Sequence, residues 1–68
     1  MKESLMSNVK KKRVEQGMTQ QHVADAIGVS RQTVVAIEGG NYTPSVMLAL
    51  KLSQLLDCSV EELFIIKN

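Results

Sequence analysis

Three consecutive polar residues, Arg31, Gln32 and Thr33, follow a serine at the expected start of a helix. An arginine can donate two hydrogen bonds to O6 and N7 of guanine, and a glutamine can pair in the same bidentate way with N6 and N7 of adenine. Each good pair contributes about 1–3 kcal/mol of discrimination against the wrong base. The chemistry that this segment is suited to is therefore hydrogen bonding to the edges of bases.

Catalytic chemistry has no comparable support in the sequence. There is no pairing of a nucleophile with a base, no phosphate-binding glycine loop and no pair of catalytic carboxylates. A chain of 68 residues has one core and little room for a deep substrate cleft. We therefore expect no enzyme activity and no metal, cofactor or small-molecule ligand.

The single histidine and the single cysteine each have a structural and a functional interpretation. His22 has no cysteine or histidine at ligand spacing, so we expect it to face solvent, with metal binding or pH sensing as the alternatives. We expect Cys58 to be a small, half-buried residue; a redox sensor, the alternative, would need an exposed thiolate of low pKa. A lone cysteine excludes an intramolecular disulfide, and no apolar run is long enough to span a membrane. Both observations favour a cytoplasmic protein.

Five short helices are the elements that must position these residues. The first is predicted from residue 4 to 16, because Leu5, Met6 and Val9 repeat at helical spacing. The predicted caps of the later helices are Thr19, Ser30, Thr43 and Ser59, with Pro44 at the first helical position of the fourth and Glu62 completing a capping box in the fifth. The predicted fold class is all-α, a compact five-helix bundle over residues 1–68 in one domain, and the last few residues are compatible with a short extended tail.

The stretch from residue 20 to 37 has the pattern of two helices that cross steeply. Ala24 is small where the helices must approach, and Gly28 occupies the turn, where a positive φ is needed. Apolar residues that would bind the pair to the rest of the domain are Val23, Ile27, Val29, Val34 and Ile37. This is a helix-turn-helix, whose second helix lies in the major groove with its N-terminal residues at the base edges. Val35 points outward there, either against a thymine methyl group or as an ordinary exposed valine.

The net charge of +1 conceals an uneven distribution along the chain. Residues 1–13 carry a charge of +4, residues 14–37 a charge of −1 and residues 38–68 a charge of −2. The basic residues of the first segment are Lys2, Lys10, Lys11, Lys12 and Arg13. A lysine run is usually a solvated helix face, and contact with DNA phosphates is the alternative.

Five segments carry a resemblance that covers residues 8 to 64: VKKKRVEQGMTQ at 9–20, VADAIGVSRQTV at 23–34, AIEGGNYTPS at 36–45, LALKL at 48–52 and SVEELF at 59–64. In these segments the chain resembles the phage-repressor-like helix-turn-helix proteins, the XRE family that includes the lambdoid repressors and Cro. It is most similar to the minimal members that consist of this domain alone. The resemblance implies a lambda-repressor-like fold, a two-fold dimer, sequence-specific binding of double-stranded DNA and control of transcription.

The resemblance also implies roles for particular residues. Gln20 would contact a phosphate and brace the recognition helix, and the loop 40–43 would run along the DNA backbone. The DNA-binding residues expected from the motif and its helix are Lys10, Gln20, Ser30, Arg31, Gln32, Thr33, Val35, Ala36, Asn41, Tyr42 and Thr43. Arg13 and Glu38 resemble the partly buried ion pair of the family. Two departures are Gly39, where the family often has asparagine, and a loop without a basic residue, so phosphate attraction depends more on residues 10–12.

Four large apolar residues, Leu63, Phe64, Ile65 and Ile66, lie close to the end of the chain. A core of this size can take two of them, and an exposed apolar patch marks an interface. We therefore expect a symmetric homodimer with residues 60–68 at its interface. The alternative is that the tail folds back onto its own core.

The expected function is a transcriptional repressor that acts as a homodimer on a pseudo-palindromic operator, with half-site centres about 34 Å apart. Occlusion of the promoter is the expected mode, because the chain has no room for a sensor domain. Controller proteins of restriction or phage modules and antitoxins are alternatives on the same fold. A protein-interaction module that has lost DNA binding is the alternative from another class, and Arg31 and Gln32 argue against it.

Overall fold

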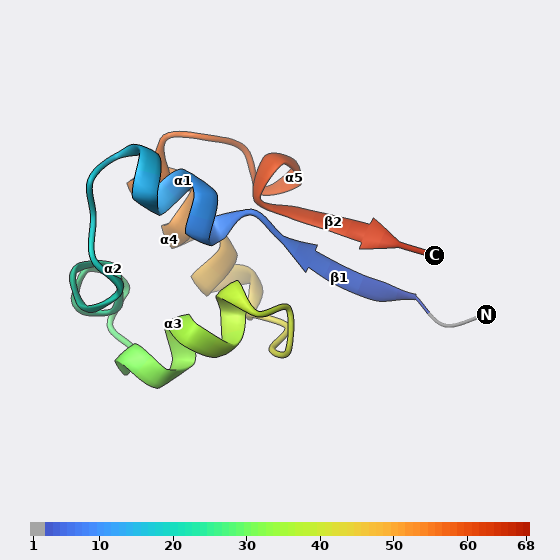
Figure 1. Ribbon diagram of the computed structural model, residues 1–68, viewed down its shortest axis with the longest axis horizontal. Helices are drawn as coiled ribbons and strands as arrows, with labels where there is room; N and C mark the ends of the chain where they lie inside the picture. Colours follow the sequence, from blue (N-terminus) through green and yellow to red (C-terminus); the bar gives the residue numbers. More distant parts are fainter. Residues whose placement is uncertain (1–2) are drawn as a thin grey trace.

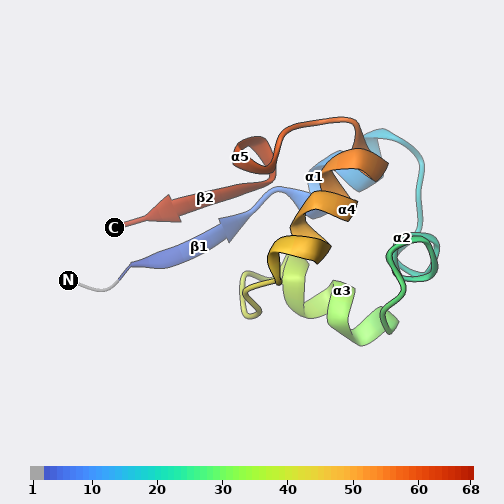
Figure 2. The same ribbon diagram turned by 180° about the vertical axis from the view of Figure 1, so that it is seen from behind.

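The computed structural model describes residues 3–68. Within these residues, a pair of strands extends from a body of helices (Figure 1). The elements in chain order are β1 (Ser4–Ser7), α1 (Val9–Glu15), α2 (Gln20–Ile27), α3 (Arg31–Glu38), α4 (Val46–Leu56), α5 (Val60–Leu63) and β2 (Phe64–Lys67). Seen from behind, α4 lies on the near side of the body and the strands extend away from it (Figure 2). Lys2, one of the basic residues of the first segment, lies outside the described residues.

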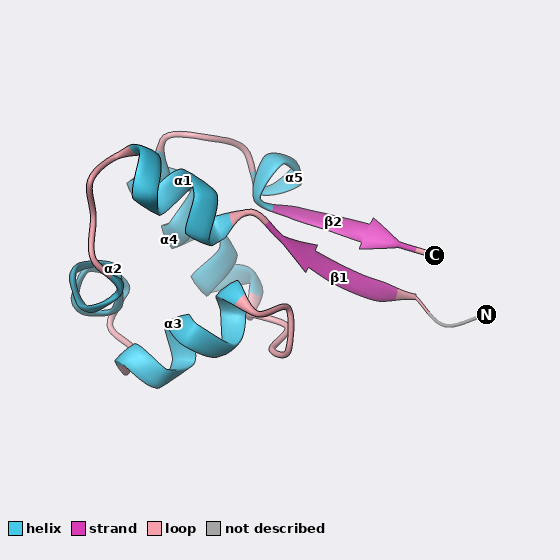
Figure 3. Ribbon diagram, viewed as in Figure 1, coloured by secondary structure: helices cyan, strands magenta, loops and turns pink. Residues whose placement is uncertain are grey.

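The described ends of the chain meet in an antiparallel two-stranded ribbon (Figure 3). The paired positions are Ser4 with Lys67, Leu5 with Ile66, Met6 with Ile65 and Ser7 with Phe64. The prediction of a helix from residue 4 is therefore wrong for residues 4–7, and the all-α class describes only the helical body. The extended C-terminal tail is confirmed as a strand.

The strand replaces the predicted helix because its partners come from the far end of the chain. Leu5 and Met6 lie at helical spacing from Val9, and a four-residue apolar stretch is compatible with either structure when it is considered locally. At the end of β1, the backbone N–H of Asn8 donates to the carbonyl of Leu63 at 2.8 Å, and Asn8 Nδ2 donates to the carbonyl of Glu62 at 3.1 Å. These two bonds hold the start of α1 beside α5, and Asn8 is the residue at which β1 has ended and α1 has not yet begun.

Three of the predicted helix caps are confirmed. The side chains of Thr19, Ser30 and Ser59 accept hydrogen bonds from the backbone N–H groups three residues later in α2, α3 and α5. In α5 the box is complete, because the Glu62 carboxylate also accepts from the backbone N–H of Ser59 at 2.9 Å. Capping bonds of this kind satisfy N–H groups that have no partner inside the helix.

The fourth predicted cap is wrong by two residues. The helix α4 begins at Val46, and its N-cap is Ser45, whose Oγ accepts from the backbone N–H of Leu48 at 3.2 Å. Thr43 and Pro44 lie in the irregular segment before the helix. Both Thr43 and Ser45 have the chemistry of a cap, so the pattern alone could not rank them.

The core lies where the five helices meet and consists of aliphatic side chains. Its buried members are Val9, Val23, Ala24, Ile27, Val34, Ile37, Leu52, Leu56 and Leu63. Ala24 has no exposed surface, as expected where α2 and α3 approach, and Gly28 has a φ of 78° in the turn between them. Leu63, which the sequence pattern assigns to the dimer surface, is also fully buried, because α5 turns it into the core of its own chain. It therefore has no surface to offer to a second copy.

The longest described helix, α4, has 11 residues. No helix among residues 3–68 is long and apolar enough to cross a membrane.

Candidate nucleic-acid interface

One side of α3 is packed into the body and the other is open. Val34 and Ile37 are buried, whereas Arg31 and Gln32 are exposed in the first turn. Val35 is 45% exposed, so its outward orientation is confirmed. The helix therefore presents a polar N-terminal turn followed by a small apolar spot.

The other residues at this helix that are predicted to contact DNA either form hydrogen bonds within the chain or are partly buried. Ser30 Oγ accepts from the backbone N–H of Thr33 at 3.2 Å and lies 3.1 Å from Thr33 Oγ1. Thr33 and Ala36 are half-buried. The hydroxyl groups of Ser30 and Thr33 thus hold the first turn of α3. Ser30 Oγ retains capacity for one further hydrogen bond and Thr33 Oγ1 for two.

A chain of hydrogen bonds runs from the exposed start of α3 into the body. Arg31 Nε donates to Gln20 Oε1 at 3.3 Å, across the turn between α2 and α3. Gln20 Nε2 in turn donates to Glu38 Oε1 at 3.1 Å. The Glu38 carboxylate fixes which end of the Gln20 amide faces it, because only the amide nitrogen can donate to an anion. The amide oxygen is then left to face Arg31.

Glu38 is itself held by Arg13, as the ion pair of the family implies. Arg13 Nε donates to Glu38 Oε2 at 2.6 Å, and Nη2 donates to Oε1 at 3.3 Å. Arg13 is 8% exposed, and its Nη1 donates to the carbonyl of Met18 at 2.8 Å. The pair joins α1 to the end of α3, and the prediction of a structural ion pair is confirmed.

The loop after α3 is exposed at Asn41, Tyr42 and Thr43. It turns at Gly40, whose φ is 75° and where an added Cβ would lie 2.8 Å from the carbonyl oxygen of Leu5. A side chain is therefore excluded both by the backbone conformation and by the close approach of β1. The strand β1 therefore packs closely against the loop at Gly40.

A glycine suits position 39 for a different reason. Its φ is −80°, so the backbone conformation is open to other residues, but a Cβ there would lie 3.1 Å from Asn41 Nδ2. An asparagine at this position, as in many family members, would require Asn41 to move. The glycine that replaces the family's usual asparagine at position 39 therefore leaves room for the side chain of Asn41.

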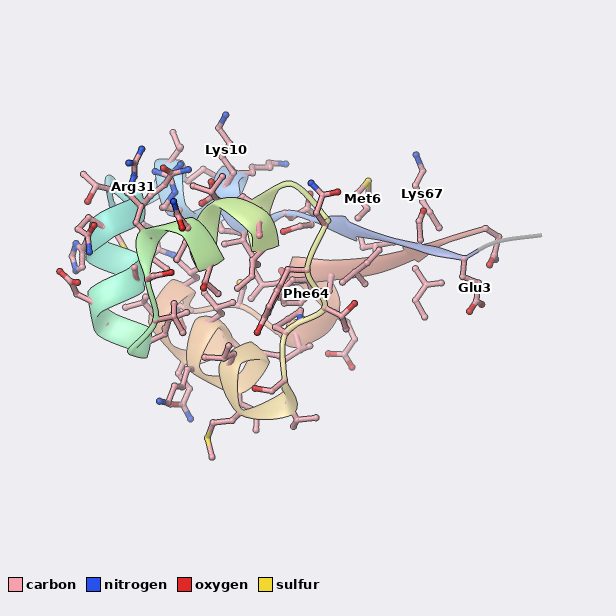
Figure 4. All side chains as sticks on the ribbon, turned by 90° about the horizontal axis from the view of Figure 1, so that it is seen from below. Glu3, Met6, Lys10, Arg31, Phe64 and Lys67 are labelled. Atoms are coloured by element: carbon pink, nitrogen blue, oxygen red, sulfur yellow. The ribbon has the colours of Figure 1, made fainter. Side chains whose placement is uncertain are left out.

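The lysine run lies on α1, with Lys10 and Lys11 exposed. Lys12 is half-buried and approaches Glu15 at 4.0 Å. Lys10 and Arg31 extend to the same side of the molecule, from α1 and α3 (Figure 4). Positive charge is thus gathered along the edge that carries the start of α3.

A protein-family model described as helix-turn-helix matches residues 9–63, which is most of the chain. The chain belongs to this helix-turn-helix family. An HTH-type transcriptional regulator of Archaeoglobus fulgidus is 38% identical over 61 residues, which cover 90% of this chain and 87% of that protein. The HTH-type transcriptional regulator YgzD of Bacillus subtilis is 40% identical over 60 residues, which cover 88% and 91% of the two chains.

Solved structures extend the comparison to the fold. The restriction-modification controller protein C.AhdI of Aeromonas hydrophila is similar with a TM-score of 0.73 and 29% identity, over 81% of this chain and 83% of that one. The XRE resemblance is confirmed, and this helix-turn-helix protein is a transcriptional regulator with a DNA-binding fold. Both named relatives are described as HTH-type transcriptional regulators.

Two residues of this helix-turn-helix regulator, Cys58 and His22, had open interpretations. The half-buried position of Cys58 is confirmed. Burial, followed by the charge of Glu62, raises the pKa of the Cys58 thiol, so the thiolate is disfavoured at neutral pH. His22 is exposed in the first turn of α2, where its backbone N–H donates to Thr19 Oγ1 at 3.0 Å. Among residues 3–68, no three histidine, cysteine or acidic side chains are grouped to hold a metal ion.

The pattern did not predict two features of the regulator. The first is the particular bond from Arg31 to Gln20, which joins the first residues of two successive helices and leaves no periodic signal. The resemblance implies that Gln20 braces the recognition helix, and this bond is how it does so. The second is a group of exposed apolar side chains at the start of α4, at Val46, Met47 and Leu50. The unbroken apolar run from 46 to 50 was a signal for the second, since one face of a helix cannot bury all five residues.

Proposed function

We propose that the protein is a transcriptional repressor that binds double-stranded DNA as a homodimer, with α3 of each copy in the major groove. The observation that supports this most is the exposed N-terminal turn of α3, in which Arg31 is oriented by a hydrogen bond to Gln20. A long side chain held in one orientation loses less conformational entropy when it binds a base edge. Occupation of a promoter by such a dimer would exclude the transcription machinery.

We assign the residues of α3 to contacts with base edges, with a thymine methyl group and with the DNA backbone beside them. Arg31 and Gln32 would donate to base edges, with guanine as the partner that suits arginine and adenine the partner that suits glutamine. Val35 would contact a thymine methyl group. Ser30 and Thr33 would bond to the flanking backbone, and the small side chain of Ala36 would allow the helix to approach the groove closely.

Contacts to phosphate are assigned to elements on either side of α3. Gln20 retains one amide hydrogen for a phosphate oxygen, because the other bonds to Glu38. Lys10 would act as a nearby positive charge from α1. Asn41, Tyr42 and Thr43 would donate to the backbone from the loop, which carries no charge of its own. Affinity should fall as salt rises, since cationic side chains displace counterions from the duplex.

The dimer would be two-fold symmetric, with the two α3 helices about 34 Å apart, one turn of DNA. Ile65 and Ile66, which are 38% and 66% exposed, remain the tail residues proposed for the interface. Phe64 is half-buried and packs against the core of its own chain, which is the alternative for this residue. Acidic residues predominate from residue 38 onward, so a dimer joined near its C-terminal ends would turn its basic edges toward one duplex.

An electrophoretic mobility shift with the upstream region of the protein's own gene tests this function. Arg31→Ala should weaken specific retardation, by about 1–3 kcal/mol of binding free energy at each half-site, and leave the circular dichroism spectrum unchanged. Lys51→Ala is the matched control, because it removes one exposed positive charge from α4, a helix to which no DNA contact is assigned. Equal specific binding by Arg31→Ala and the wild type would show that α3 does not read the site.

A controller of a restriction-modification system is the second candidate. The similarity to C.AhdI, itself a restriction-modification controller protein, favours it specifically. Genes for a nuclease and a methyltransferase beside this gene would support the controller, and their absence would leave a repressor of other genes. Both candidates use the same DNA interface.

A further inference from the structure

One face of the ribbon formed by β1 and β2 is open to solvent along its whole length. Directly paired residues point to the same face of a ribbon, and successive residues alternate between the two faces. The open face, which we call the Lys67 face, carries four exposed residues: Ser4, Met6, Ile65 and Lys67. On the opposite face, three of the four strand residues are half-buried: Leu5, Ser7 and Phe64.

The Lys67 face turns toward the side of the molecule on which the start of α3 is exposed. In Figure 4, Lys67 extends from the ribbon to the same side as Lys10 and Arg31. Glu3, which precedes β1, extends to the opposite side in that view. The charges at the ribbon are thus separated, with the cation on the side of the proposed DNA interface and the carboxylate away from it.

The base of the ribbon lies against the loop 40–43, which we assign to the DNA backbone. An added Cβ at Gly40 would lie 2.8 Å from the carbonyl oxygen of Leu5, so β1 and this loop approach closely. The pair of Ser4 and Lys67 is the next position along the ribbon. Consecutive Cα atoms are about 3.8 Å apart and paired Cα atoms about 4.5–5.5 Å, so the Cα atoms of Lys67 and Leu5 lie within about 10 Å of each other.

A DNA strand held by the loop would offer further phosphates along the ribbon. Each strand of a duplex carries one phosphate for about every 3.4 Å of helix axis. The four residues of β2 extend over about 13 Å, a length that corresponds to about four phosphates of one strand. A lysine side chain at the outer end of the ribbon therefore has phosphates within reach once the loop is on the backbone.

The charge of the surrounding elements is complementary to a polyanion. Residues 4–14, 39–56 and 63–68, which include the ribbon and the loop, contain no aspartate or glutamate. The loop itself has no basic residue, whereas many family members carry one there. Lys67 is the cation of the ribbon that packs against this loop. An ammonium group binds phosphate as a point charge and does not require a particular arrangement of base edges.

We propose that the ribbon is a further DNA-binding element, in which Lys67 of each copy binds a phosphate next to those contacted by the loop 40–43. The proposal rests on the proposed function and adds a backbone contact to it. Lys67 supplies the positive charge that the loop lacks, and the hydroxyl of its cross-strand partner Ser4 is a second donor on the same face. The contact uses the outer end of the Lys67 face, so Ile65, nearer the body, and Ile66, on the opposite face, stay available to the dimer interface.

The salt dependence of DNA binding tests the contact, with the duplex that the wild type selects from random DNA as the probe. Each neutralised phosphate contributes about 0.9 to the slope of the logarithm of the binding constant against the logarithm of salt concentration, so Lys67→Gln should lower the slope of a dimer by about 1.8. Lys67→Arg keeps the charge and should retain the wild-type slope. The relative preference among duplexes of different sequence should not change, because phosphate carries no sequence information.

Lys51→Gln is the matched control for the loss of one positive charge per copy. Lys51 is exposed on α4, to which no DNA contact is assigned, and its variant should keep a slope close to that of the wild type. An unchanged slope in Lys67→Gln would overturn the proposal. Equal reductions in Lys67→Gln and Lys51→Gln would also overturn it, because the effect would then come from net charge and not from a contact.

Phosphate ethylation interference locates the contact on the same duplex. Ethylation removes the charge of one phosphate, so in the wild type it should weaken binding at the loop-contacted phosphates and at one neighbouring phosphate of each half-site. With Lys67→Gln, the interference should disappear at that neighbouring phosphate alone. Identical interference patterns for the two proteins would overturn the proposal.

The failure of this inference is distinguishable from that of the proposed function. A wild type that enriches no duplex would refute the proposed function and the ribbon contact with it. Specific binding that depends on Arg31, but whose salt slope and interference pattern are unaffected by Lys67→Gln, would refute the ribbon contact and leave the proposed function intact.

Discussion

Arg31 donates from Nε to Gln20 Oε1 at 3.3 Å, so the first residue of the recognition helix is held by the first residue of the helix before it. Behind this bond, Gln20 is held by Glu38, and Glu38 is held by the buried guanidinium of Arg13. The orientation of an exposed base-reading side chain is thus determined by an ion pair inside the fold. Four side chains from three helices act as one unit.

The first prediction concerns the Gln20 link. Gln20→Ala should lower operator affinity, because Arg31 loses the partner that orients it. Since part of this loss acts through Arg31, the double variant with Arg31→Ala should lose less affinity than the sum of the two single losses, by about 0.5–3 kcal/mol. Titrations of all four proteins against one operator at fixed salt give this coupling. Strictly additive losses would mean that Gln20 acts independently of Arg31, as a phosphate contact alone.

The second prediction concerns the buried ion pair. The side chain of Glu38 is 5% exposed, and removal of its partner by Arg13→Ala leaves its charge uncompensated. We expect a loss of about 3–5 kcal/mol in the free energy of unfolding, measured in urea. Lys12→Ala is the control, because it breaks a surface pair with Glu15 at 4.0 Å and should cost less than about 1 kcal/mol. Similar losses for the two variants would contradict the structural role of Arg13.

The third prediction compares two glycines with nearly the same backbone conformation. Gly28 and Gly40 have φ values of 78° and 75°, but only at Gly40 would a Cβ meet a neighbour, the carbonyl oxygen of Leu5 at 2.8 Å. Gly28→Ala should cost about 1–2 kcal/mol from the left-handed conformation alone. Gly40→Ala should cost more, because the loop or β1 must also move. Thermal unfolding of the pair measures the difference, and equal costs would contradict the close approach of loop and strand.

The fourth prediction concerns acid. Hydrogen bonds from the backbone and side chain of Ser59 lower the pKa of the Glu62 carboxyl. Because this pKa is lower in the folded chain than in the unfolded chain, the contribution of Glu62 is fully present above the unfolded pKa and is lost as pH falls through the folded pKa. Glu62→Gln should therefore reduce the acid dependence of stability, whereas Glu61→Gln, at an exposed position outside the cap, serves as the control. An NMR titration that finds the pKa of the Glu62 carboxyl not lowered in the folded chain would contradict this explanation.

Local signals in the sequence predicted the elements that position the site. The caps Thr19, Ser30 and Ser59 and the turn at Gly28 depend on residues within one turn of each other, and all are present. Leu5 and Met6 were misassigned because their partners Ile66 and Ile65 come from the other end of the chain. The α4 cap was misplaced because Thr43 and Ser45 offer the same chemistry.

The candidate site was predictable in its residues but not in its contacts. The types and spacing of Arg31, Gln32 and Val35 place them on the open side of α3, and the structure has them there. The bond between Arg31 and Gln20 depends on the crossing of two helices and on the orientation of an amide that Glu38 fixes. Such relationships arise from packing in three dimensions and have no counterpart in the periodicity of the sequence.

Selection of binding sites from random DNA duplexes, carried out in parallel with the wild type and Arg31→Ala, tests whether α3 reads the bases of an operator. The wild type should enrich a two-fold symmetric site with half-sites centred about one helical turn apart. The Arg31→Ala selection should lose its preference at one position of each half-site, with a cost of about 1–3 kcal/mol, and keep the symmetry and spacing. Enrichment of no symmetric site by the wild type, or of identical sites by the two proteins, would contradict the assignment of α3 as the helix that reads DNA.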